Sequence, residues 1–144
     1  MADDIEIVLI TTENTSVLDA VADDVFDAPI QRDLLATYLA SELNLLLVAV
    51  DATMEPPTVV AHCSAVIHTR PEKPTELFLS ELGTTPSHRR RGIARRLVTE
   101  TIAAGRVRGC ASAWIATEPE NEPARRLYET MGDIELAVIY EFDT

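Results

Sequence analysis

The sequence predicts one α/β domain, of the α+β kind, in which a mixed central β-sheet is flanked by about four helices. Three observations predict it. The chain has 144 residues, whereas chains divide into several domains only beyond roughly 250 residues. Its first half holds apolar runs separated by proline turns, which is typical of hairpins. Its second half alternates strand and helix patterns, so residues 1–144 are expected to form a single domain.

The N-terminal half begins with an alternating strand pattern from Ile5 to Ile10, followed by cap residues at Asn14 and a helical pattern as far as Val25. A second short helix is predicted after Pro29, where apolar side chains recur at helical spacing. The continuous apolar run from Leu45 to Val50 predicts a strand that is buried on both faces. A proline turn then leads to the paired strand, from Thr58 to Thr69.

The C-terminal half continues with a strand from Glu76 to about Thr84. Two apolar ribs predict a helix with a broad buried face from Arg89 to Arg108. A strand from Ser112 to Thr117 and a helix from Glu122 to Met131 follow, and a closing strand from Ile134 to Phe142 ends the chain. Hairpins followed by strand–helix–strand–helix–strand imply the mixed sheet.

The composition excludes several functional classes. The net charge of −12 argues against binding to nucleic acid or anionic membranes, whose phosphates attract basic proteins. Two cysteines, Cys63 and Cys110, are too few for a disulfide framework or a tetrahedral zinc site, so we expect no metal. The acidic first residues differ from a signal peptide, and no segment approaches the roughly 20 apolar residues of a membrane helix. We therefore expect a soluble, cytoplasmic protein.

The charge is distributed unevenly along the chain. Residues 1–88 hold three basic and fifteen acidic side chains, whereas residues 89–144 hold nine of each. Seven arginines lie between Arg89 and Arg108, together with a single acid, Glu100. The chain thus places positive charge at the start of one predicted helix, while its acidic part is suited to attract a cationic partner.

The start of that helix is a candidate phosphate site. A helix N-terminus presents unpaired N–H groups and a partial positive charge, and Gly92 lets a ligand approach the backbone. Main-chain N–H groups from about Arg90 to Arg95 could hold a pyrophosphate. A solvated basic helix start with a packing glycine explains the same residues, and spacing alone leaves both interpretations open.

Two motifs resemble those of a known family. The pattern Pro-x-x-Arg-x-x-Gly-x-Ala, from Pro86 to Ala94, looks like the pyrophosphate-binding motif of the GNAT family of N-acetyltransferases. The segment from Asn121 to Gly132 resembles the family's second signature, Asn-x-x-Ala-x-x-Leu-Tyr-x-x-x-Gly. The resemblance covers about residues 48–142. Within the family, the sequence looks most similar to the small branch that contains the aminoglycoside 3-N-acetyltransferases. It implies the family's fold, with fourth and fifth strands that splay apart, and acetyl-CoA as co-substrate.

The resemblance also implies which residues contact acetyl-CoA. The end of the fourth strand would bind the pantetheine arm, the basic loop would hold the pyrophosphate, and Asn121 would contact the co-substrate further along. Asn121 is equally placed to cap the helix that follows it, and the two roles are compatible. The expected cofactor-binding residues are Leu82, Gly83, Thr84, Arg89, Arg90, Arg91, Gly92, Ile93, Ala94, Arg95 and Asn121.

The resemblance assigns catalysis less completely. Tyr128 matches the tyrosine that protonates the departing thiolate in the family, although a core aromatic is the alternative. Many members carry a glutamate base in the fifth strand, where this chain has Ala116. Glu81, at the end of the fourth strand, and Glu118, after the fifth, are the substitute proton acceptors. Each could instead be a solvated acid. A further alternative for Glu118 is a charge that attracts the amine without accepting its proton.

The sequence therefore predicts an N-acetyltransferase that passes the acetyl group of acetyl-CoA directly to a primary amine of a small, cationic substrate, such as an aminoglycoside or a polyamine. A protein or peptide N-acetyltransferase is one alternative. A non-catalytic acetyl-CoA-binding module is another, because the base expected at Ala116 is absent. The family also suggests a homodimer.

Overall fold

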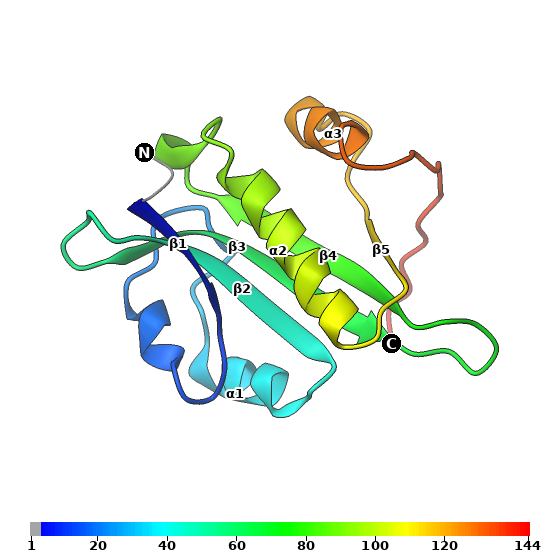
Figure 1. Cartoon of the computed structure of the whole chain (residues 1–144), viewed down its shortest axis with the longest axis horizontal. Helices are drawn as coiled ribbons and strands as arrows, with labels where there is room; N and C mark the ends of the chain where they lie inside the picture. Colours follow the sequence, from blue (N-terminus) through cyan, green and yellow to red (C-terminus); the bar gives the residue numbers. More distant parts are fainter. Residues whose placement is uncertain (1–3) are drawn as a thin grey trace.

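The computed structural model describes residues 4–144, which form one five-stranded β-sheet with helices on both faces (Figure 1). Neighbouring strands in the sheet follow the chain order, β1-β2-β3-β4-β5. The strands are β1 (Ile5–Leu9), β2 (Asn44–Asp51), β3 (Thr58–His68), β4 (Glu76–Thr84) and β5 (Ser112–Ile115). The helices are α1 (Arg32–Ala40), α2 (Ile93–Val107) and α3 (Glu122–Glu129), with short 3₁₀ turns η2 (Thr15–Asp19) and η3 (Pro86–His88).

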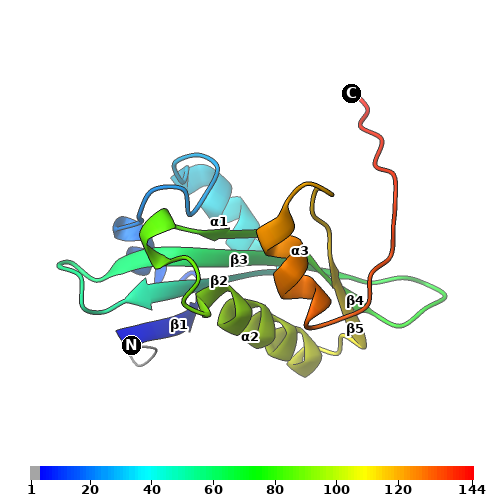
Figure 2. The same cartoon turned by 90° about the horizontal axis from the view of Figure 1, so that it is seen from above.

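The sheet is mixed, as the sequence predicts. The first four strands pair antiparallel, and β5 pairs parallel with β4 after the crossover through α2. Figure 2 shows α1 and α2 on opposite faces of the sheet, and the chain runs from the end of β5 into α3 (Figure 1). No helix within residues 4–144 combines the length and the apolar character that crossing a membrane requires.

The core consists of two apolar layers, one on each face of β2. Alternate side chains of this strand enter different layers: Leu45 and Leu47 pack toward α2, whereas Leu46 and Val48 pack toward α1. Successive side chains of a strand point to opposite faces, so a strand covered on both faces must be apolar throughout. This geometry explains the uninterrupted apolar run in the sequence.

The fourth and fifth strands separate, as the resemblance implies. Their pairing ends at Leu79 and Ile115, where β5 stops, while β4 continues to Thr84. The backbone of β4 beyond Leu79 is therefore paired with β3 alone and keeps a free edge toward β5. Free N–H and C=O groups on such an edge can bind an extended ligand.

The predicted helix from Asn14 to Val25 is wrong, because the structure has only the short turn η2 there. The reason is an alternative set of backbone hydrogen bonds. Val59 of β3 donates its N–H to the Ala20 carbonyl at 2.9 Å, and Ala22 donates to the Val59 carbonyl at 2.9 Å. The segment thus extends along the part of β3 that β4 leaves unpaired, and its apolar side chains still reach the core.

Two further expectations need correction. The helix predicted from Arg89 begins at Ile93, because Gly92 adopts a left-handed conformation with φ of 77°. The strand predicted from Ile134 to Phe142 is absent, and that segment has neither helix nor strand. In β5, Trp114 is 47% exposed and stacks on Phe78 with ring centroids 4.2 Å apart.

Candidate functional site

The free end of β4 lies against an irregular segment around Val25. A Cβ atom at Gly83 would come within 2.2 Å of the Val25 carbonyl oxygen, so only glycine fits this position. The close approach gives the free edge of β4 a fixed wall on one side. Leu82, Gly83 and Thr84, which the resemblance assigns to pantetheine binding, all lie on the part of the strand that β5 leaves unpaired.

The basic loop between β4 and α2 presents unpaired backbone donors. Arg90 and Gly92 both have left-handed conformations, with φ of 62° and 77°, and these turn the chain into α2. Among residues 4–144, no acceptor bonds to the main-chain N–H groups from Arg90 to Arg95. No atom would come within 4 Å of a Cβ at Gly92, so the loop is open at that point. These N–H groups are free to bind an anion.

Arginine side chains surround this loop with two different roles. Arg89 Nε donates to the Thr84 carbonyl oxygen at 3.1 Å, and Arg95 Nη1 donates to Thr130 Oγ1 at 2.7 Å. These two contacts tie the loop to β4 and to the end of α3. Arg90 and Arg91 are exposed and have no side-chain partner in the described part of the chain. Their guanidinium groups therefore remain available to a phosphate.

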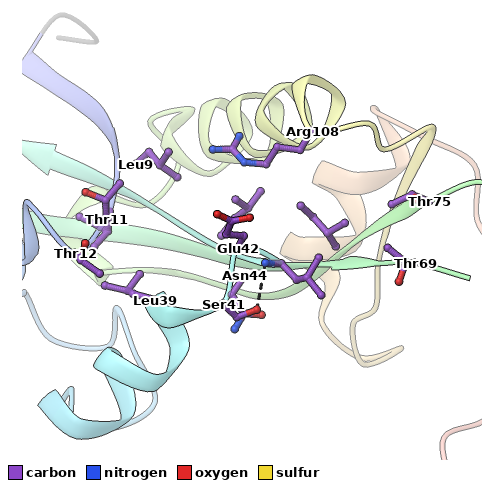
Figure 3. A pocket seen from close by; sticks show the side chains of 14 residues that line it. Leu9, Thr11, Thr12, Leu39, Ser41, Glu42, Asn44, Thr69, Thr75 and Arg108 are labelled. Carbon is purple, nitrogen blue, oxygen red and sulfur yellow. Dashed lines mark hydrogen bonds between the residues drawn. The ribbon is translucent and has the colours of Figure 1, made fainter.

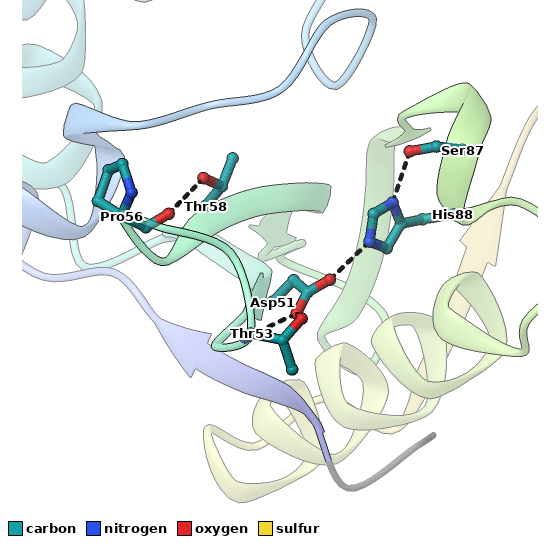
Figure 4. A network of polar contacts seen from close by, with 6 residues as sticks. All are labelled: Asp51, Thr53, Pro56, Thr58, Ser87 and His88. Carbon is teal, nitrogen blue, oxygen red and sulfur yellow. Dashed lines mark hydrogen bonds and ion pairs between the residues drawn. The ribbon is translucent and has the colours of Figure 1, made fainter.

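A buried polar network fixes the turn just before the loop (Figure 4). Asp51, at the end of β2, accepts a hydrogen bond from His88 Nε2 at 2.8 Å. His88 Nδ1 lies 2.7 Å from Ser87 Oγ, and Thr53 Oγ1 donates to the other carboxylate oxygen of Asp51 at 2.6 Å. Because Asp51 and His88 are both buried, this contact holds η3 on the sheet and so positions the start of α2.

The Asp51 network makes the stability of the fold depend on pH. The hydrogen bonds from Thr53 and then from His88 lower the pKa of Asp51 from 3.8 to about 2. A depressed carboxylate pKa stabilises the fold above pH 4, and that contribution is lost as the pH falls toward 2. We expect Asp51→Asn to cost at most about 2 kcal/mol of unfolding free energy at pH 6. Urea unfolding of both proteins at pH 6 and pH 2.5 checks this; a difference as large at pH 2.5 as at pH 6 would contradict it.

A histidine that sequence analysis did not single out lies beside Glu81. His62 of β3 is 2% exposed, and its Nδ1 donates to the Val25 carbonyl oxygen at 2.7 Å. The opposite ring nitrogen, Nε2, has no hydrogen-bond partner within residues 4–144 and lies 3.4 Å from Glu81 Oε2. Because a carbonyl can only accept, the proton of the neutral ring is on Nδ1, and Nε2 directs a lone pair toward Glu81.

The surroundings of His62 keep its ring neutral and fixed. Burial lowers its pKa below the ordinary 6.5, against the opposing effects of the Val25 carbonyl and the Glu81 carboxylate. Phe26 stacks on the imidazole with ring centroids 3.9 Å apart, and the charge of Asp27 also acts on it. A neutral imidazole with an unpartnered lone pair beside a half-exposed carboxylate is a chemically competent proton acceptor.

Tyr128 of α3 lies on the other side of the sheet. It packs against the cluster that includes Leu82, which is the neighbour of Glu81 in β4. Successive strand residues point to opposite faces, so Tyr128 and Glu81 flank the free end of β4 from opposite sides. Burial raises the pKa of Tyr128 to about 12, and its hydroxyl has no hydrogen-bond partner in the described chain. The hydroxyl therefore keeps its proton at neutral pH and is free to donate it.

The remaining candidates follow β5. Ala116 comes directly after the strand and is exposed, as is Glu118, whose carboxylate forms no hydrogen bond or ion pair among residues 4–144. Asn121 Oδ1 accepts a hydrogen bond from the Ala124 N–H at 3.3 Å, which confirms the helix cap. The contact of Asn121 with the co-substrate stays a prediction. The structure thus pairs Glu81 with His62 and leaves Glu118 in a solvated loop.

Two other features do not belong to this site. No three His, Cys, Asp or Glu side chains of residues 4–144 gather in a way that could hold a metal. An open hollow of about 740 Å³ lies at the opposite end of the sheet, where Figure 3 shows Glu42 and Asn44 below Arg108. It is lined by the end of β1 and the residues after it, the end of α1, the start of β2, the end of β3, Thr75 and Arg108, and by none of the candidate residues.

Comparison with known proteins identifies relatives of the whole chain. The model of the acetyltransferase (GNAT) family matches residues 16–133. No curated protein sequence matches significantly.

Solved structures share the fold at low identity. An aminoglycoside acetyltransferase from an uncultured soil metagenomic sample superposes with a TM-score of 0.81 and 20% identity, over 97% of this chain and 98% of its own. Another aminoglycoside acetyltransferase from such a sample, in complex with sisomicin, has a TM-score of 0.76 and 14% identity, over 99% and 97% of the two chains. AAC(6')-Iy with a CoA-containing bisubstrate analogue has a TM-score of 0.74 and 19% identity, over 97% and 99%.

Proposed function

Because the chain belongs to the acetyltransferase (GNAT) family, we propose that it transfers the acetyl group of acetyl-CoA to a primary amine of a small cationic molecule. The predicted family and the predicted kind of fold are both confirmed. The single observation that carries the proposal is that an open, arginine-rich loop lies next to the end of β4 that β5 leaves unpaired and to the His62–Glu81 pair. The substrate, the direct transfer and the roles of individual residues are our inference.

The donor side of the site suits acetyl-CoA. When bound, acetyl-CoA supplies the acetyl thioester, and its pyrophosphate and pantetheine need different partners. The free N–H groups from Arg90 to Arg95 and the unpartnered guanidinium groups of Arg90 and Arg91 fit the pyrophosphate. The free edge of β4 at Leu82, Gly83 and Thr84 fits the amide groups of pantetheine, and an N–H there can stabilise the developing oxyanion.

Proton transfer is divided between the two faces of β4. The half-exposed Glu81 carboxylate takes up the proton that the attacking amine must lose and passes it to the buried His62 Nε2, 3.4 Å away; the carboxylate then stabilises the resulting imidazolium. Tyr128 donates its hydroxyl proton to the departing sulfur. Its raised pKa makes this transfer less favourable in the free enzyme, so the proton must move as the carbonyl re-forms. Glu118 remains the second candidate for the proton acceptor, and Glu118→Gln would remove its carboxylate.

The acceptor side suits a cationic amine. The carboxylates of Glu81 and Asp27 both act on His62, so the proton-accepting end of the site lies in a negative potential. Of the superposed structures, one is a complex with sisomicin and another is a complex with a bisubstrate analogue, CoA-S-monomethyl-acetylneamine. An aminoglycoside- or polyamine-like substrate is therefore the proposal. The cytoplasmic location remains a prediction from the sequence.

Binding of the co-substrate is the first test. We expect acetyl-CoA at about 100 times its Kd to stabilise the fold by roughly 2.7 kcal/mol, since it binds the folded state alone. Thermal melting with acetyl-CoA, CoA and pantetheine measures this, and pantetheine should give the smallest shift because it lacks the pyrophosphate. No shift with acetyl-CoA would overturn the proposed function.

The amine is tested next by release of free thiol with polyamines, aminoglycosides and basic peptides. Release with small polycations supports the proposed substrate class. Release with peptides alone would indicate a protein acetyltransferase, and a thermal shift without thiol release on any amine would indicate a binding module.

A further inference from the structure

Trp114, the only tryptophan of the chain, is 47% exposed although it belongs to a strand of the central sheet. Its ring stacks on Phe78 of β4, with centroids 4.2 Å apart and ring planes inclined by 24°. The two residues lie opposite each other in the register of β4 and β5, and we call them the aromatic platform. An exposed indole face attracts cations, because the face of the ring carries negative π-electron density.

A polar network holds the indole in a fixed orientation. The pKa of Glu76, at the start of β4, lies below its ordinary 4.5. The main cause is a hydrogen bond with His68, followed by the charge of Arg70 and a hydrogen bond from the indole N–H, which is the only polar group of Trp114. The Glu76 carboxylate is itself fixed, since its oxygens lie 3.1 Å from His68 Nδ1 and 3.5 Å from Arg70 Nη2. An exposed ring that is held in this way loses little freedom when a ligand binds to it.

The aromatic platform lies on the same face of the sheet as the His62–Glu81 pair. The neighbours of Phe78 and of Trp114 along their strands pack into the apolar layer that faces α2, so both rings point to the opposite face. His62 points to that opposite face as well, because it stacks on Phe26, which packs against the layer that faces α1. Helix α1 packs on β2, whereas the platform lies on β4 and β5. The platform and the proposed proton acceptor therefore share one face of the sheet.

The sheet register sets the separation between the platform and the proton acceptor. Glu81 lies opposite Ser64 of β3, and Phe78 lies opposite Val66, two residues further along that strand. Two to three residues of a strand span about 7–10 Å, and the next strand lies about 5 Å to the side. The backbone positions of Glu81 and Trp114 are therefore roughly 10 Å apart.

We propose that the aromatic platform is a second subsite for the acceptor substrate and binds an ammonium group other than the one that is acetylated. This inference rests on the proposed function, because it takes the reacting amine to lie at the His62–Glu81 pair. A cation over the indole of Trp114 is attracted by the ring, and the acidic Glu81 complements the rest of a polycationic molecule. Glu76 is already paired with basic side chains, so the indole face is the recognising group. The occupant is therefore a polyamine with two nitrogens roughly 10 Å apart.

Tryptophan fluorescence tests this binding without acetyl transfer, since Trp114 is the only tryptophan and its emission reports on this ring alone. Hexamethylenediamine and spermidine, added without acetyl-CoA, should change the emission and reach saturation. Ethylenediamine is too short to reach both ends, and hexylamine lacks the second amine, so each should need about tenfold higher concentrations for half of the change. An emission that hexamethylenediamine leaves unchanged, or that hexylamine changes at the same concentration, would overturn the proposal.

Acetyl transfer gives the second readout. Trp114→Leu should lower the ratio of kcat/KM for hexamethylenediamine to that for hexylamine by about tenfold, mainly through KM. Trp114→Phe keeps an aromatic face and should lower this ratio only about two- to threefold. Circular dichroism and the melting shift with acetyl-CoA verify that both variants are folded.

The outcomes separate this subsite from the proposed function. A ratio that stays unchanged in Trp114→Leu, or an equal loss on both amines, would refute the subsite while the wild-type protein still acetylates amines. If the wild-type protein acetylates no amine, the proposed function fails, and the fluorescence titration still decides whether the platform binds a diamine.

Discussion

Replacing Tyr128 by phenylalanine is expected to lower kcat about 100-fold, while the Kd for acetyl-CoA and the melting temperature change little. The hydroxyl forms no hydrogen bond with residues 4–144, so its loss breaks none and leaves the packing of the ring intact. The proton for the departing sulfur would then have to come from solvent. Steady-state kinetics with the best amine, together with acetyl-CoA titration, separate these effects.

Tyr38 provides the matched control. Its hydroxyl lies on the opposite face of the sheet and donates to the Leu45 carbonyl at 2.5 Å, with the Ala65 carbonyl 3.1 Å away. Tyr38→Phe should therefore reduce stability by about 1 kcal/mol and leave kcat near the wild-type value. If Tyr128→Phe retained full kcat, or if both variants lost activity equally, the proton-donor role of Tyr128 would have to be abandoned.

The fold was predictable where local pattern and burial agree. The apolar run of β2, the hairpin to β3 and the apolar ribs of α2 each indicate which side chains are buried, and the structure has all three elements. The segment after Asn14 has helical spacing, but hydrogen bonds between its backbone and Val59 outweigh that preference. No local signal reveals that β3 has an unpaired stretch there. The segment after Ile134 likewise has a strand pattern, but no strand among residues 4–144 pairs with it.

The candidate site could also be predicted only in part. The open backbone of the loop from Arg89 to Ala94 could be predicted because a motif of fixed spacing determines it, whereas its contact with a pyrophosphate stays a prediction. The proposed proton acceptor was only half predictable. Glu81 was identified from its place at the end of β4, but His62 is brought to it by the β3–β4 register, in which His62 pairs with Gly83 across a bulge after Ser64. A sequence without known register gives His62 no signal beyond being polar within an apolar run.

Replacing His62 by asparagine is expected to lower kcat by about 100-fold or more, because the proposed proton acceptor is lost. The asparagine amide can still donate to the Val25 carbonyl, as Nδ1 does, but it has no group at the position of Nε2. The variant therefore removes the lone pair that faces Glu81 while keeping the contact that positions the ring. Phe26→Leu is the control for packing: it removes the stacked ring but leaves the lone pair, and its kcat should fall only a few-fold.

The pH profile of kcat separates a proton acceptor from a structural histidine. Burial lowers the pKa of His62, so protonation should reduce the wild-type kcat only at a pH below the ordinary 6.5, and this limb should disappear in His62→Asn. Glu81 and Asp27 are the charges that act on the ring, so Glu81→Gln should move the limb to still lower pH by removing a carboxylate that favours the imidazolium. If the two groups act as one unit, the double variant should lose little more than His62→Asn alone. Additive losses, or an acid limb that persists without His62, would show instead that the amine gives its proton to another group, for which Glu118 is the first variant to measure.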